Sequence, residues 1–232
     1  MSELDSDKPS YFIRRVDFDD EESMQIIAEM HMELLHFGPM AALGERFIRE
    51  ICYQKLVQDG VMQVAILEID GAAAGFIAYT PLPYEFHKGI MYRNFFRASY
   101  LAMLSLLQRP SRIIRLLRVA RTIMARVDES VRHEPNLGEI VCIAVRPAYL
   151  KSSVIKDIGI RVPDELLRFA ARELFEKKQV RRLRMIVDAE NRHALFLYHR
   201  LGARFEQRVW AGEDKTDVQF ELSQDAPIMR LQ

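Results

Sequence analysis

The chain has 232 residues, 49% of them hydrophobic and 28% charged, which is ordinary for a globular protein and enough for one domain with insertions. Its 33 basic and 33 acidic residues balance, and no nucleic-acid-binding motif is present, so we expect no nucleic-acid partner. The polar, acidic N-terminus is unlike a targeting peptide, no apolar run can span a bilayer, and the two cysteines lack metal-ligand spacing. We therefore expect a cytoplasmic protein with reduced thiols and no metal.

The first third of the chain has a β-α-α-β-β pattern. Alternating residues predict a strand at 11–17, and the acids at 19–22 suit the N-terminus of the helix that follows. An apolar stripe predicts a second helix at about 43–57. Two further strands are expected at 61–69 and 74–80, joined by the hairpin turn Asp70-Gly71.

A basic insertion is expected at about 83–137. From 86 to 127 the sequence has no acid but has Lys88 and eight arginines, so this segment is +9 and the rest of the chain is −9. Two amphipathic helices are expected within it, at 95–107 and 112–127. Their arginines can be solvated while the apolar faces pack on the body, or they can contact an anionic membrane surface or an acidic carrier protein.

The last third of the chain again alternates strands with helices. Strands are expected at 139–145, 183–188, 204–210 and 218–222, helices at 164–178 and 191–202, and a loose tail at 223–232. Within this part, Asn191 suits a helix N-cap, Ala194, Leu197, Tyr198 and Leu201 share one helical face, and Gly202 ends the helix.

The run from Asn191 to Gly202 resembles the Asn-x-x-Ala-x-x-Leu-Tyr-x-x-x-Gly signature of the GNAT superfamily of N-acyltransferases. The resemblance implies an α/β fold with a mixed, mostly antiparallel sheet of six or seven strands, flanked by helices, in one domain over 1–222. It also implies transfer of an acetyl or other acyl group from a coenzyme A thioester to a small-molecule or peptide amine. The oligomeric state is not predicted.

The resemblance also assigns site residues. Backbone groups of Ile143, Ala144 and Val145, in the central strand, would hold the acyl donor, an oxyanion-type role that needs no particular side chain. Tyr198 would be the general acid that protonates the departing thiolate. Asn191 would cap its helix, contact the donor, or do both. Glu139 is a candidate base for the amine, with a solvated carboxylate as the alternative.

The phosphate-binding loop departs from the family pattern. After the central strand, the family has a glycine-rich turn that opens directly into a helix, where backbone N–H groups meet the pyrophosphate. Here only Lys156, Gly159 and Arg161 keep that spacing, too far before the helix, and Asp164 and Glu165 begin the helix with negative charge. Three readings stay open: acetyl-CoA held in a rearranged loop, an acyl-carrier-protein donor, or a GNAT scaffold that only binds.

Overall fold

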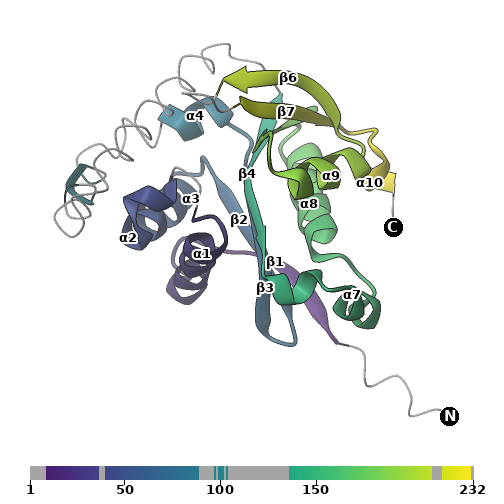
Figure 1. Ribbon diagram of the computed structural model, residues 1–232. Coiled ribbons are helices and arrows are strands. Elements are labelled where there is room, and N and C mark those ends of the chain that lie inside the picture. Colours follow the sequence, from purple (N-terminus) through teal and green to yellow (C-terminus); the bar gives the residue numbers. More distant parts are fainter. Residues whose placement is uncertain are drawn as a thin grey trace.

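The computed structural model describes residues 9–36, 40–88, 97, 99–101, 103, 136–210 and 216–230. One seven-stranded sheet forms its centre, in the order β1-β2-β3-β4-β5-β7-β6 (Figure 1). Only β4 and β5 pair in parallel, so the predicted mixed, mostly antiparallel sheet is confirmed. The strands are β1 (Tyr11–Arg15), β2 (Gln63–Ile69), β3 (Ala72–Thr80), β4 (Leu137–Val145), β5 (Arg182–Asp188), β6 (Arg204–Trp210) and β7 (Thr216–Ser223).

Helices cover both faces of this sheet (Figure 1). One face carries α1 (Glu21–Leu34), α2 (Glu45–Phe47), η2 (Ile48–Lys55) and α3 (Leu56–Gln58). The other carries α8 (Val162–Arg172), η6 (Glu173–Lys177), α9 (Arg192–Arg200) and α10 (Pro227–Arg230). The remaining short elements are η1 (Met40–Leu43), α4 (Pro83–Lys88), η5 (Pro147–Leu150) and α7 (Ser152–Ile158).

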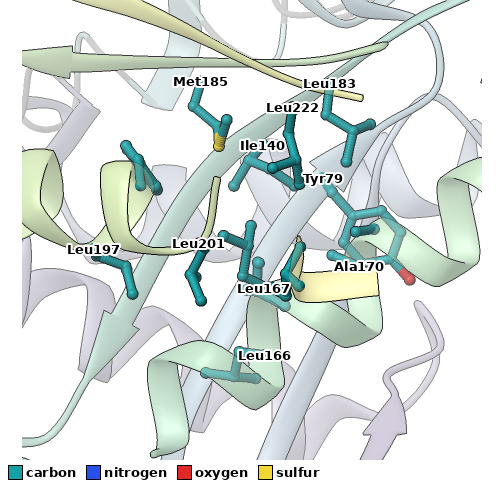
Figure 2. Packing of buried hydrophobic residues seen from close by; sticks show 14 of the residues in the cluster. Tyr79, Ile140, Leu166, Leu167, Ala170, Leu183, Met185, Leu197, Leu201 and Leu222 are labelled. Atoms are coloured by element: carbon teal, nitrogen blue, oxygen red, sulfur yellow. The ribbon is translucent and has the colours of Figure 1, made fainter. Parts of the chain in front are cut away.

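Each face of the sheet has its own apolar core. On the α8–α9 face, one core includes Leu166 and Leu167 of α8, Leu197 of α9, Leu201 just after it, and Ile140 of β4 (Figure 2). On the α1 face, the core includes Met24, Ile27 and Met30 of α1 and Ile48, Tyr53 and Leu56 of the next helical stretch. The alternation of each strand thus directs side chains into two cores, which fix the sheet between the helix layers.

Three local features differ from the sequence predictions. The helices expected at 43–57 and 164–178 both contain a π-helical segment, η2 and η6. The sequence does not reveal these segments, because the wider turn leaves the apolar stripe nearly unchanged. The prediction of a loose C-terminal tail is wrong: α10 follows β7, and Ile228 is fully buried in the core. The residues after the central strand, where a phosphate-binding loop was expected, form the short helices η5 and α7.

Most of the basic insertion, including the helix expected at 112–127, lies outside the described residues, whereas residues 97, 99–101 and 103 of the helix expected at 95–107 are described and are helical. Of its described part, Leu101 is buried, and the Arg97 guanidinium pairs with the Glu50 carboxylate of η2 at 2.8 Å. Arg46 pairs with the same carboxylate at 2.6 Å, so the start of the insertion is held against η2. Within the described part of the chain, no helix combines the length and the apolar character needed to cross a bilayer.

Candidate active site

The two parallel strands at the centre of the sheet pair over only part of their length. The ladder between β4 and β5 joins residues 137–140 to 182–185 and then ends, although both strands continue. Beyond that point β4 stays paired with β3 as far as Val145, and β5 stays paired with β7 as far as Asp188. Residues 141–145 and 186–188 therefore face each other without a ladder, and we call this the β4–β5 split.

A bulge marks the start of the split. Ala78 pairs with Cys142 and Tyr79 with Ile140, so Val141 is an extra residue in β4. The four β4 residues before the bulge are buried, whereas Val141, Cys142, Ile143 and Val145 are partly exposed. The split therefore leaves the second half of β4 open on the side where β5 would pair.

Two backbone donors of β4 point into the split. Arg146 donates its N–H to the Ala74 carbonyl, and antiparallel pairing directs every second N–H to the partner strand. By this alternation the Ala144 N–H also faces β3, while those of Ile143 and Val145 face away from it. A central strand thus has, over a few residues, the free donors of an edge strand.

Tyr198 lies on α9, beside this opening. Its ring is 5% exposed and packs on Phe220 of β7, with 5.9 Å between ring centroids. Burial, with a smaller contribution from charge on Cys142, raises the pKa of the Tyr198 phenol, so the phenol stays protonated at neutral pH. The described residues supply no hydrogen-bond partner for its hydroxyl.

The ends of α9 explain two further positions of the signature. Asn191 Oδ1 accepts a hydrogen bond from the Ala194 N–H at 3.1 Å, so Asn191 caps the helix. Gly202 follows the helix with φ +90°, which favours glycine. A Cβ at Gly202 would also lie 2.4 Å from Pro227 Cδ, so the same glycine lets α10 approach.

The N-terminus of α8 lies at the open end of β4. A Cβ at Gly75 would meet both the Ala144 carbonyl oxygen and Leu166 Cδ1 at 2.9 Å, and Gly75 pairs with Val145. The first turns of α8 therefore pack directly against the end of the split. Backbone N–H groups at this helix end favour an anion.

No family model matches the sequence, and no curated protein matches it. Solved structures do match. A GNAT-family protein from Desulfovibrio desulfuricans superposes with a TM-score of 0.57 at 13% identity, over 92% of this chain and 99% of its own. A spermidine N-acetyltransferase from Vibrio cholerae, SpeG, gives 0.52 at 12%, over 92% and 94%. YncA from Salmonella typhimurium, described as an acetyltransferase and solved with acetyl-CoA, gives 0.50 at 14%, over 93% and 94%.

This chain has the GNAT fold. The similarity covers nearly the whole of each structure, and the identities of 12 to 14% show the fold alone. Within this fold, Tyr198 lies on α9, and α8 and α9 share the core that covers one face of the sheet.

Glu139 lies in the paired half of β4, before the split. Its carboxylate accepts from Nη2 and Nε of Arg184 on β5, at 2.6 and 3.1 Å, and its side chain is 4% exposed. Arg184 is also its partner in the ladder. This ion pair joins the two strands where they are still together, a structural position that does not bring Glu139 to the split.

The candidate phosphate ligands lie on the surface after β4. Lys156 is exposed on α7, Gly159 ends α7 with φ +79°, and exposed Arg161 immediately precedes α8. The acids of the first turn of α8 are not free: Asp164 pairs with Arg200 of α9, and Glu165 pairs with Arg168. The repulsion that these acids would exert on a pyrophosphate is therefore offset by two arginines.

One residue at the split was not singled out from the sequence. Cys142 was expected to be an ordinary buried thiol, yet it is partly exposed and directly follows the bulge. Tyr53 Oη lies 3.6 Å from its Sγ. Nothing in the apolar run 139–145 marks the bulge, because each of its residues also suits an unbroken central strand.

Proposed function

We propose that this protein is an N-acyltransferase that moves an acetyl or other acyl group from a coenzyme A thioester to an amine. The observation that carries the proposal is the β4–β5 split, where the ladder ends and the N–H groups of Ile143 and Val145 face away from β3. The buried phenol of Tyr198, whose hydroxyl has no partner among the described residues, supports it. The GNAT fold and the acetyl-CoA bound to YncA support the same donor class. SpeG is named for a polyamine substrate, which supports an amine acceptor.

The reaction divides between the two sides of the split. The thioester arm lies along β4, where the N–H groups of Ile143 and Val145 donate hydrogen bonds to the arm and to the thioester oxygen. As the amine attacks the acyl carbon, negative charge develops on that oxygen, and fixed backbone donors stabilise it without reorganising. The N–H of Ala144 faces β3, so Ala144 donates no hydrogen bond to the thioester arm and only spaces the two donors along the strand.

Tyr198 acts on the leaving group. The attacking nitrogen bonds to the acyl carbon and loses its extra proton to solvent, and when the tetrahedral intermediate collapses the carbon–sulfur bond breaks and negative charge passes to sulfur. The phenol, which burial keeps protonated until then, passes its proton to that sulfur and is reprotonated from solvent. Asn191 caps the helix that carries Tyr198, and this role accounts for its side chain. Glu139 is held by Arg184, so the proposal does not depend on it as the base.

The coenzyme phosphates are expected at the N-terminus of α8. Lys156, Gly159 and Arg161 precede that helix, and their charges and exposed backbone would replace part of the missing glycine-rich turn. A carrier-protein thioester presents one phosphodiester and would need less of this region, so it is the alternative donor. Both donors use the same split.

Donor binding is the first test. Acetyl-CoA at one hundred times its dissociation constant should stabilise the folded protein by about 2.7 kcal/mol, seen as a rise in unfolding temperature. An acetylated carrier protein is the comparison ligand: stabilisation by it alone would favour the alternative donor. If neither ligand stabilises the protein, the acyltransferase proposal is wrong and a GNAT scaffold with another ligand remains.

Tyr198→Phe tests the chemical step. The substitution removes only the hydroxyl, so turnover should fall by about 10²–10⁴ while acetyl-CoA binding is retained. Tyr79→Phe is a matched control, because Tyr79 lies in the same core and its buried hydroxyl has no partner among the described residues. Equal turnover in the Tyr198→Phe and Tyr79→Phe variants would remove Tyr198 from the mechanism.

A further inference from the structure

Three polar side chains form a hydrogen-bonded row that ends at the split. His31 Nδ1, on α1, lies 2.6 Å from Tyr53 Oη on η2, and Tyr53 Oη lies 3.6 Å from Cys142 Sγ on β4. His31 is 8% and Tyr53 2% exposed, whereas Cys142 is partly exposed. The row therefore runs from the buried layer under α1 to the open half of the central strand.

Two irregular elements bring these groups together. In a regular strand, Cys142 would point to the same face as Ile140, which faces α8. The extra residue Val141 reverses this, so Cys142 turns to the α1 face instead. On the opposite side, Tyr53 lies in the π-helical segment η2, a rare form that recurs at functional sites.

All three groups of the row are neutral at neutral pH. Burial lowers the pKa of His31 to about 4, raises the pKa of Tyr53, and raises the pKa of Cys142 to about 11. A neutral imidazole nitrogen accepts a hydrogen bond from the Tyr53 hydroxyl, whose oxygen then accepts from the Cys142 thiol. In this direction the sulfur accepts from the Ala78 backbone N–H and keeps a second lone pair that can accept from a ligand.

Cys142 also interacts with the other side of the sheet. Only well above neutral pH, where the thiol loses its proton, does charge on Cys142 add to burial in raising the pKa of Tyr198, which lies on the α9 face. The ladder that would separate the two faces is absent at this point. The acyl carbon of a thioester in the split would therefore have Tyr198 on its sulfur side and Cys142 on the side toward α1.

We propose that the Cys142 sulfur accepts a hydrogen bond from the attacking amine, and that Tyr53 and His31 are positioning residues that orient the thiol. This inference rests on the proposed acyl transfer. Because the thioester arm and α9 occupy one face, the acceptor approaches from the α1 face. An amine N–H directed at sulfur turns the nitrogen lone pair toward the acyl carbon, which favours attack.

The test uses the full-length protein, acetyl-CoA as donor and n-butylamine as acceptor, with coenzyme A release measured by chromatography. A neutral hydrogen bond contributes about 1 kcal/mol, so Cys142→Ala should lower kcat/KM for n-butylamine about fivefold at unchanged acetyl-CoA affinity. Cys142→Ser keeps an acceptor atom and should retain activity. Cys52→Ala, which removes the neighbouring buried thiol outside the row, should match the wild type.

Tyr53→Phe distinguishes positioning from packing. The ring keeps its edge contact with Phe76, but the thiol loses its partner, so kcat/KM for n-butylamine should fall. In a double variant with Cys142→Ala, Tyr53→Phe should lower kcat/KM little further, since both substitutions act on the same contact to the amine. Equal kinetics in Cys142→Ala and wild type, or equal losses of kcat/KM in Cys142→Ala and Cys142→Ser, would overturn this inference and leave the proposed acyl transfer standing. Absence of acetyl-CoA binding would overturn the proposed function and this inference together.

Discussion

The stability of the protein should fall in mild acid because of His31. Burial holds its folded pKa at about 4, against 6.5 for the free side chain, so the unfolded chain binds this proton more readily. Stability is therefore fully present above pH 6.5 and is lost as the pH falls toward 4. Linkage gives a loss of about 3 kcal/mol at pH 4 from this group. Urea unfolding between pH 7 and pH 4 measures it.

His31→Gln isolates this contribution. Glutamine can still accept from the Tyr53 hydroxyl but does not titrate, so the variant should lose about 3 kcal/mol less than the wild type over this range. Carboxylates titrate in both proteins and cancel in the difference. Exposed His193→Gln should follow the wild type. Parallel pH curves for wild type and His31→Gln would show that His31 is not buried as a neutral base.

Two further substitutions test the frame of the split. Glu139→Gln leaves Arg184, whose side chain is 15% exposed, without its counter-charge and should lower the free energy of unfolding in urea by about 1–3 kcal/mol; a slow enzyme of unchanged stability would instead indicate that Glu139 is a base. Gly75→Ala forces a Cβ within 2.9 Å of the Ala144 carbonyl oxygen, and should cost about 1–3 kcal/mol and weaken acetyl-CoA binding. A Gly75→Ala protein with wild-type stability and affinity would show that this close packing does not support the site.

The sequence predicted the elements around the site because their signals are local. Asn191 caps α9, Gly202 ends it and Asp70-Gly71 turns the β2–β3 hairpin, and each feature depends on neighbours a few residues away. The apolar stripe of Leu197 and Leu201 likewise fixes which face of α9 meets the core. These predictions needed no knowledge of distant partners.

The split itself could not be read from the sequence alone. The end of the β4–β5 ladder depends on where two strands stop pairing whose partner residues, such as Ile140 and Met185, lie 45 positions apart in the chain, and the resemblance to GNAT enzymes supplied that expectation. The bulge at Val141 leaves no mark in a run of β-prone residues, so the exposure of Cys142 was missed. The π-helical form of η2 was missed for the same reason, since periodicity does not separate it from an α-helix.

Amide hydrogen exchange measured by NMR, with and without acetyl-CoA, tests the central claim most directly. If the thioester arm binds along the open half of β4, the N–H groups of Ile143 and Val145 should become protected when acetyl-CoA is added. The Ala144 N–H, already directed to β3, should change little. Protection of Ala144 alone, or no change at Ile143 and Val145 in protein saturated with acetyl-CoA, would contradict the account.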